Sequence, residues 1–198
     1  MDLIVLATGN EGKARELRAL LSGIATRIES LRDHPAVTLP PEGDRSYREN
    51  ALAKARAVHA ALGVPALGDD SGLDVDALDG APGIRSARFA GATATDEANN
   101  RKLLEALRGL PAERRTARFR CFLALAGGPE GDIVVEGECR GRIVEAPRGV
   151  QGFGYDPLFQ PEGETRTYAE LPPDVKDTIS HRARAAAELR SALARIGA

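Results

Sequence analysis

The chain has 198 residues, 42% of them hydrophobic and 28% charged, with a formal net charge of −2. This composition is ordinary for a water-soluble globular protein, and we expect one compact domain over residues 1–198. The near-neutral charge argues against a nucleic-acid-binding module, and no apolar run approaches the ~20 residues of a membrane span. The N-terminus lacks the features of a signal peptide, and the two cysteines, Cys121 and Cys139, are expected to be free thiols in a reducing cytoplasm.

The first element is a continuous apolar run, Leu3–Ala7, which predicts a strand buried on both faces. A glycine-bearing turn over residues 8–13 follows, and then a helix. In this order, backbone N–H groups and the positive end of the helix dipole can bind a phosphate, and Lys13 adds a cation. Two residues separate the glycines of the turn, instead of the four of a nucleotide P-loop, so a plain turn is the alternative.

A second strand is expected within residues 25–31 and a proline-containing loop over 33–45. The spacing of a capping box then predicts a helix over 46–62. Asn50 and Lys54 lie one turn apart on a face of this helix other than its apolar one. A solvated face is the usual explanation for such a pair.

Two adjacent carboxylates, Asp69 and Asp70, follow the apolar approach Val64–Leu67 and are expected to end a strand there. Because burying unpaired charge costs several kcal/mol, acids at a strand terminus suggest ligands for a hard cation or a base acting on water. An exposed turn is the equally weighted alternative, since Asp, Ser and Gly all favour turns.

The rest of the chain predicts a mixed arrangement. We expect a short helix or turn over 83–91, a helix over Asp96–Arg108 and strands at Thr116–Ala126, Ile133–Val135 and Gly141–Val144, the last two separated near Gly137. Parallel units at the start thus give way to an antiparallel meander. This pattern predicts an α/β fold with a mixed sheet and helices on both sides.

Two later stretches carry candidate binding residues. The glycine-rich segment Gly149–Phe159 holds three of the eight aromatic residues. A ring on such a loop can stack on a planar base, although anchoring the loop to the core is the commoner role. Ser180 is a plausible N-cap for the last helix. His181 and Arg182 would then lie in its first turn and oppose the helix dipole, either for recognition or by chance.

Six short motifs occur in order: Ala7–Asn10 with Lys13, Glu49–Ala51 with Lys54, Asp69–Leu73, Gly80–Gly83 with Ser86–Arg88, Gly152–Pro157 and Ser180–Arg182. Together they cover nearly the whole chain and resemble the inosine/xanthosine triphosphate pyrophosphatases. Each motif alone is weak evidence, but the six in this order are specific.

The resemblance implies a role for each matching residue. Asp70 would be the catalytic carboxylate that binds Mg²⁺ and activates water, with Asp69 beside it. Glu42 would be the second metal ligand, although the glycine follows it directly where the family usually places one residue between. Lys54 would reach the phosphates. The implied substrate-binding residues are Thr8, Gly9, Asn10, Glu11, Gly12, Lys13, Ser71, Phe153, Gly154, Tyr155, Asp156, Lys176, His181 and Arg182.

The resemblance also implies two lobes about a long mixed sheet, an active site in the cleft between them, and a cytoplasmic homodimer. The implied reaction is Mg²⁺-dependent hydrolysis of ITP, dITP and XTP to the monophosphate and pyrophosphate, which keeps deaminated bases out of DNA and RNA. The alternatives are a related pyrophosphatase for modified pyrimidine nucleotides and a nucleotide-binding regulator without catalysis.

Overall fold

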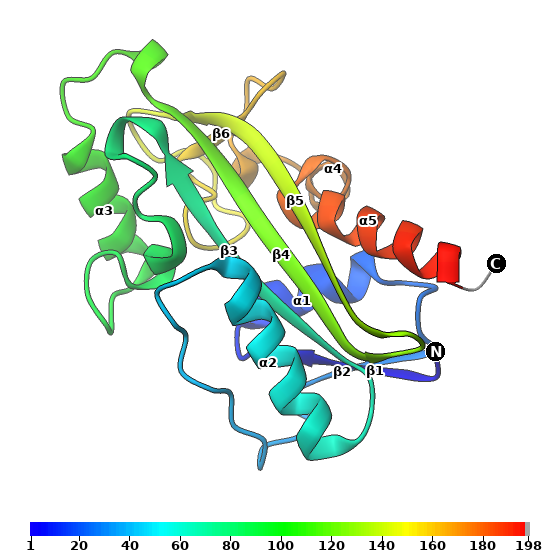
Figure 1. The fold of residues 1–198 in the computed structure, drawn as a ribbon. Helices are drawn as coiled ribbons and strands as arrows, with labels where there is room; N and C mark the ends of the chain where they lie inside the picture. Colours follow the sequence, from blue (N-terminus) through cyan, green and yellow to red (C-terminus); the bar gives the residue numbers. More distant parts are fainter. Residues whose placement is uncertain (197–198) are drawn as a thin grey trace. The chain divides into compact units, whose positions relative to one another are not determined.

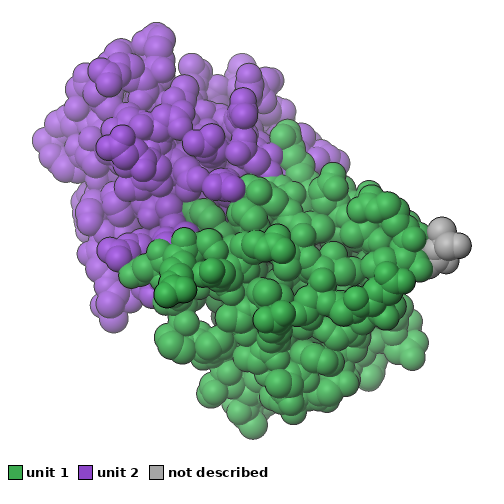
Figure 2. All heavy atoms as spheres, in the orientation of Figure 1, with its two compact units in different colours: residues 1–70, 121–137, 181–198 green, residues 71–120, 138–180 purple. Residues whose placement is uncertain are grey.

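The computed structural model describes residues 1–196, and the chain forms two compact units (Figure 2). Unit 1 contains residues 1–70, 121–137 and the segment from 181 onward; unit 2 contains residues 71–120 and 138–180. Two compact units agree with the two lobes that the family resemblance implies.

A six-stranded mixed sheet has the strand order β2-β1-β3-β4-β5-β6. Its strands are β1 (Leu3–Ala7), β2 (Arg27–Ser30), β3 (Ala66–Val75), β4 (Thr116–Gly128), β5 (Gly131–Ile143) and β6 (Phe159–Pro161). β1 pairs in parallel with β2 and β3, whereas β5 and β6 are antiparallel. The expected α/β fold with a mixed sheet is therefore confirmed, although β6 was not anticipated.

In unit 1, alternating side chains of β1 separate two helical layers. Ile4 and Leu6 belong to one apolar cluster with residues of α1 (Glu11–Leu20) and α5 (His181–Ile196). Val5 points the other way, into a cluster that includes Val58 of α2 (Tyr47–Leu62). Figure 1 shows α2 on one side of β1 and the α1–α5 pair on the other. Because successive side chains of a strand alternate in direction, a continuous apolar run serves both layers.

Unit 2 is built on an aromatic core next to two helices, α3 (Asp96–Ala106) and α4 (Pro173–Ile179). The rings of Phe119, Phe159 and Tyr168 lie 4.8–5.8 Å apart between centroids. Leu103 of α3 and Tyr155 belong to the same apolar cluster. Four of the chain's eight aromatic rings are therefore buried in the core of this unit.

Two expected strand ends are wrong. β3 does not stop at the acids but continues through them to Val75, and β5 is one strand across Gly137. A Cβ on Gly68 would lie 2.0 Å from the Ala51 carbonyl oxygen, and one on Gly137 would lie 2.1 Å from the His181 carbonyl oxygen. These glycines therefore allow α2 and α5 to approach the sheet closely; they do not break it.

Both cysteines are buried free thiols, as expected. Within the described part of the chain, no helix has the length and apolar character needed to cross a membrane.

Candidate functional site

The expected site residues fall into two groups, one in each unit. In unit 1 an acid cluster is formed by Glu42, Asp69 and Asp70 with Lys13 and Lys54. In unit 2 an aromatic loop, Gly149–Phe159, carries Phe153, Tyr155 and Asp156.

Lys54 links two carboxylates of the acid cluster. Its ammonium lies 2.5 Å from Glu42 Oε1 and 2.9 Å from Asp70 Oδ1, and it also donates to the Asp69 carbonyl oxygen at 3.3 Å. The side chains of Lys54 and Asp70 are 8% and 7% exposed. The solvated face suggested for Lys54 is therefore wrong: its α2 position places the ammonium between two acids.

Asp69 points to different partners. Its Oδ1 accepts from Lys13 Nζ at 2.5 Å, and its Oδ2 accepts from Arg182 Nε at 2.7 Å. The Cys121 thiol donates to Oδ2 at 3.4 Å. Arg182 also bonds Glu16, at 2.5 Å between Nη1 and Oε2. The exposed acid-rich turn is thus excluded, because both aspartates are buried and each is paired.

The two adjacent aspartates have opposite pKa shifts. Burial alone would raise the pKa of Asp69, but the charges of Arg182 and Lys13 hold it well below its usual value. Burial also raises the pKa of Asp70, and there the nearby Lys54 and Lys13 do not reverse the effect. Asp69 is therefore held as an anion, whereas Asp70 is the acid better suited to take up a proton.

Opposite charges also shift the cations of the cluster. Burial would lower the pKa of Lys54, but Asp70 and Glu42 outweigh it and raise the pKa. The pKa of Arg182 is likewise raised well above its usual value by Asp69 and Glu16 in spite of burial. Both side chains are therefore permanent cations at neutral pH. The unfavourable place of Arg182 in the first turn of α5 is offset by these two carboxylates.

Asn50 is a member of the site that the sequence reasoning left on the solvated face. Its Nδ2 donates to Asp70 Oδ2 at 3.1 Å and to the Gly43 carbonyl oxygen at 3.0 Å, and its Oδ1 accepts from the Gly43 N–H at 2.9 Å. It thereby fixes the backbone beside Glu42 and one oxygen of Asp70 at once. In the sequence, the one sign that Asn50 belongs to the site is its position one helical turn before Lys54.

The turn after β1 has the form expected of a phosphate-binding segment. Asn10 caps α1, because its Oδ1 accepts from the Lys13 N–H at 3.0 Å, and its own N–H donates to Thr8 Oγ1 at 3.1 Å. The Lys13 side chain folds back to Asp69, while Glu11 pairs with Arg32 at 2.7 Å. Lys13 thus belongs to the acid cluster, whereas the Glu11 side chain pairs with Arg32 at the surface.

In unit 2, Asp156 holds the aromatic loop together. Its Oδ2 accepts from the Phe153 N–H at 2.9 Å and from Lys176 Nζ at 2.6 Å. The Lys176 ammonium lies 5.3 Å from the centroid of the Phe153 ring. Phe153 is half-buried, whereas Asp156 and Lys176 are buried. One carboxylate therefore positions both a half-buried ring and a cation beside it.

The remaining expected residues occupy supporting or adjacent positions. Tyr155 is buried and donates its hydroxyl to the Ser86 carbonyl oxygen at 2.8 Å, and burial raises its pKa, so the phenol stays protonated. Ser71 follows Asp70 in β3 and is half-buried. His181 is the first residue of α5 and is buried.

Glu42 and Asp70 are the residues that could hold a divalent cation. Their oxygens converge on one ammonium in this structure, so the position already accommodates a positive charge. Mg²⁺ prefers oxygen ligands and is usually held by one or two carboxylates together with waters and substrate phosphates. The donor set fits that requirement. Among residues 1–196, no group of three or more His, Cys, Asp or Glu side chains is arranged to hold a metal ion.

Comparisons with known proteins identify the family of the chain. The Ham1 family matches residues 4–192. A protein named dITP/XTP pyrophosphatase from Geobacter sulfurreducens is 48% identical over 98% of this chain and 97% of its own length. Another protein of that name, from Xanthomonas oryzae pv. oryzae, is 49% identical over 98% of each chain.

Solved structures support the fold as well. A HAM1 protein from Coxiella burnetii has a TM-score of 0.86 and 39% identity, covering 98% of this chain and 100% of that one. The resemblance inferred from the six motifs is thereby confirmed. This chain belongs to the Ham1 family.

Proposed function

We propose that this protein hydrolyses deaminated purine nucleoside triphosphates, namely ITP, dITP and XTP, to the monophosphate and pyrophosphate. The observation that carries the proposal is the acid cluster, in which adjacent aspartates with opposite pKa shifts lie against Lys13 and Lys54. A proton-accepting carboxylate and cations that offset phosphate charge are groups that promote attack of water on a phosphoryl centre, and Asp69 holds two of the cations in place. The names of the relatives, dITP/XTP pyrophosphatase, supply the substrate class.

In this proposal Asp70 accepts the proton of the attacking water as it adds to the α-phosphorus. The P–O bond to the β-phosphate then breaks, and pyrophosphate leaves. Lys54 and Lys13 offset the negative charge of the phosphates, while Asp69 keeps Lys13 and Arg182 oriented. Asn50 positions Asp70 and the Glu42 backbone.

We further propose that Glu42 and Asp70 hold Mg²⁺ when substrate is bound. The ion would neutralise phosphate charge and orient water. Lys54 bonds both acids here, so it would have to share or exchange these contacts on metal binding. A long, flexible lysine side chain can make that change within its rotamer range.

The aromatic loop accounts for a purine in the same proposal. Phe153 offers a ring for stacking, and Lys176 beside it is a donor for the carbonyl at the purine 6-position. Adenine has an amino group there, which would leave a donor facing a donor. A buried unpaired donor costs ~1–3 kcal/mol, so such contacts disfavour ATP.

The test is pyrophosphate release from ITP, XTP, GTP, ATP and dTTP, each with and without Mg²⁺. We expect metal-dependent release from ITP and XTP and little from ATP. Orthophosphate as the product would instead indicate attack on the terminal phosphate, and a preference for dTTP would indicate a pyrimidine enzyme. Binding of ITP without turnover would support a regulator.

The protein is further proposed to be a homodimer that acts in the cytoplasm to cleanse the nucleotide pool. Its two free cysteines suit a reducing compartment. Sedimentation equilibrium would test the dimer, and incorporation of deoxyinosine into DNA in cells that lack the protein would test the cleansing role.

A further inference from the structure

The tip of the aromatic loop is held from outside by two side chains of α3. The Gly154 N–H donates to Asp96 Oδ2 at 2.7 Å, and the Gly154 carbonyl oxygen accepts from Asn100 Nδ2 at 3.0 Å. Asp96 and Asn100 are one helical turn apart, so both point to the same side of α3. Together they bond both polar groups of one residue, and we call this pair the α3 clasp.

The loop next to this contact is partly exposed to solvent. Gln151 and Gly152 are exposed and Val150 is 97% exposed, while Gly152 and Gly154 have φ angles of 78° and 62°. The N–H groups of Val150 and Gln151 are held by the Ala169 carbonyl oxygen, which fixes only the start of the loop. The positive φ angles on either side of Phe153 suit glycine, and between them the Phe153 N–H donates to Asp156 Oδ2 while its carbonyl oxygen accepts from the Asp156 N–H.

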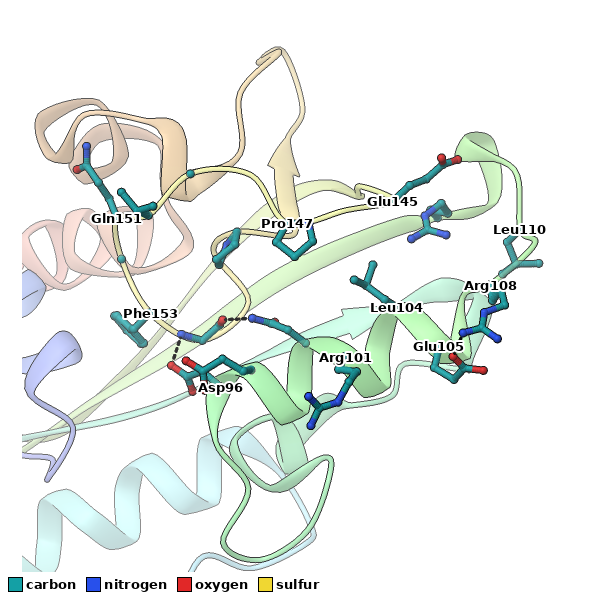
Figure 3. Close-up of a pocket in the computed structure, with 18 of the residues that line it drawn as sticks. Asp96, Arg101, Leu104, Glu105, Arg108, Leu110, Glu145, Pro147, Gln151 and Phe153 are labelled. Atoms are coloured by element: carbon teal, nitrogen blue, oxygen red, sulfur yellow. Dashed lines mark hydrogen bonds and ion pairs between the residues drawn. The ribbon is translucent and has the colours of Figure 1, made fainter.

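A cavity of about 1010 Å³ in unit 2 lies between the loop and α3. Figure 3 shows Asp96 directly beside Phe153, with dashed lines joining the helix to the loop backbone. Asp96 and Asn100 line this cavity together with Gln151, Gly152 and Phe153. Within residues 1–196 the buried Oδ1 of Asn100 has no hydrogen-bond partner, whereas its Nδ2 donates to the Gly154 carbonyl oxygen.

We propose that Asp96 and Asn100 are positioning residues for base recognition, because their clasp on Gly154 sets the place of the Phe153 ring. This inference rests on the proposed function, in which Phe153 stacks on the purine. Asp156 fixes the N–H of Phe153 from inside the loop, and the α3 clasp fixes the next residue from outside. Because the backbone is bonded at both Phe153 and Gly154, the Phe153 ring is ordered before the substrate binds. Less conformational entropy is therefore lost on binding.

The test compares Asp96→Ala and Asn100→Ala with wild type, and uses Arg101→Ala as a matched control at an exposed position of the same helix and cavity. For each protein, kcat and KM for ITP are measured together with inhibition by IMP, which has a base, and by inorganic tripolyphosphate, which has none. We expect the KM for ITP and the Ki of IMP to rise roughly 3- to 20-fold, the range of one or two lost hydrogen bonds and a weakened stack. The Ki of tripolyphosphate and the values for Arg101→Ala should not change.

An unchanged Ki of IMP in both variants would overturn the inference. An equal rise in the Ki of tripolyphosphate would also overturn it, because the effect would then not pass through the base. If an alanine variant unfolds, two conservative variants provide the same test. Asp96→Asn keeps a hydrogen-bond acceptor, so its KM and Ki should approach those of wild type. Asn100→Asp keeps the size of the side chain but loses the donor, so its KM and Ki should rise. Failure of wild type to release pyrophosphate from ITP would refute the proposed function, whereas calorimetric binding of IMP would still test the clasp.

Discussion

The acid cluster of unit 1 and the aromatic loop of unit 2 both centre on a lysine bonded to an aspartate, yet they differ in what the pair does. Lys54 is shared by Asp70 and Glu42, and burial raises the pKa of Asp70. Lys176 Nζ donates to Asp156 Oδ2 at 2.6 Å, and the same carboxylate oxygen accepts a hydrogen bond from the Phe153 N–H. The first arrangement sets proton affinity, whereas the second sets the position of a ring. The two regions should therefore respond differently to the same kind of substitution.

The largest effect is expected for Asp70→Asn. Loss of the proton acceptor should lower kcat by about 10²–10⁴-fold, the usual contribution of a general base. The raised pKa of Asp70 means that its ionised form is disfavoured in the fold, so the neutral amide should leave the free energy of unfolding unchanged or higher. Pyrophosphate release and urea unfolding measure the two quantities. A near-normal kcat would refute the assigned role.

The neighbouring Asp69→Asn should act in the opposite way on stability. It would leave the buried Arg182 and the half-buried Lys13 without the carboxylate between them, and removing one partner of a buried ion pair costs about 3–5 kcal/mol. Urea unfolding at pH 7, with Asp70→Asn as the isosteric control, gives the difference. Equal stability of the two variants would contradict the division of roles between adjacent acids.

The same residue predicts a pH dependence. The folded pKa of Asp69 lies well below its unfolded value of about 4, so its stabilisation is complete above that value and is lost as the pH falls toward the folded pKa. Wild type should therefore lose stability below about pH 4 more steeply than Asp69→Asn does. Unfolding curves between pH 3 and 7 test this, and parallel curves would show that Asp69 does not contribute.

Asp156→Asn provides the comparison in unit 2. The amide can still accept the N–H of Phe153 but loses the charge opposite Lys176, so the loop should loosen while the acid cluster is untouched. We expect the Ki of IMP to rise roughly 5- to 20-fold, with kcat for ITP nearly unchanged. A loss of kcat comparable to that of Asp70→Asn would show that the two regions do not have separate roles.

The sequence predicted the elements whose signals are local. Apolar runs and helical periodicity placed β1, α2 and α3 close to their observed bounds, and Ser46 caps α2 as expected. The errors have one cause. β3 continues past Asp69 and β5 past Gly137 as members of a sheet whose neighbouring strands come from distant parts of the chain, and no adjacent residue in the sequence reports that pairing.

The site shows the same limit. The acids, Lys13 and Lys54 were found because their types and spacing match family motifs, but their pairing was not predicted. Which lysine bonds which aspartate is decided by folding contacts across 16 residues for Lys54 and 56 for Lys13. Asn50 was assigned to solvent for that reason, since its partner Asp70 lies 20 residues away.

The smallest effect is expected for Asn50→Ala. This variant compares two contacts in which side chains bond the backbone of a glycine, one in each unit. Asn50 bonds both polar groups of Gly43, as the α3 clasp does for Gly154, but it also donates to Asp70. Its loss should therefore lower kcat by roughly 3- to 10-fold, because Asp70 would lose the hydrogen bond that orients its Oδ2. Amide exchange at Gly43 should quicken in the metal-free, nucleotide-free protein, whereas exchange at Gly154 should not. If the KM for ITP rises and kcat is unchanged, Asn50 contacts the substrate and does not position Asp70. The proposed difference between the Asn50–Gly43 contact, which supports catalysis, and the α3 clasp, which supports base binding, would then be wrong.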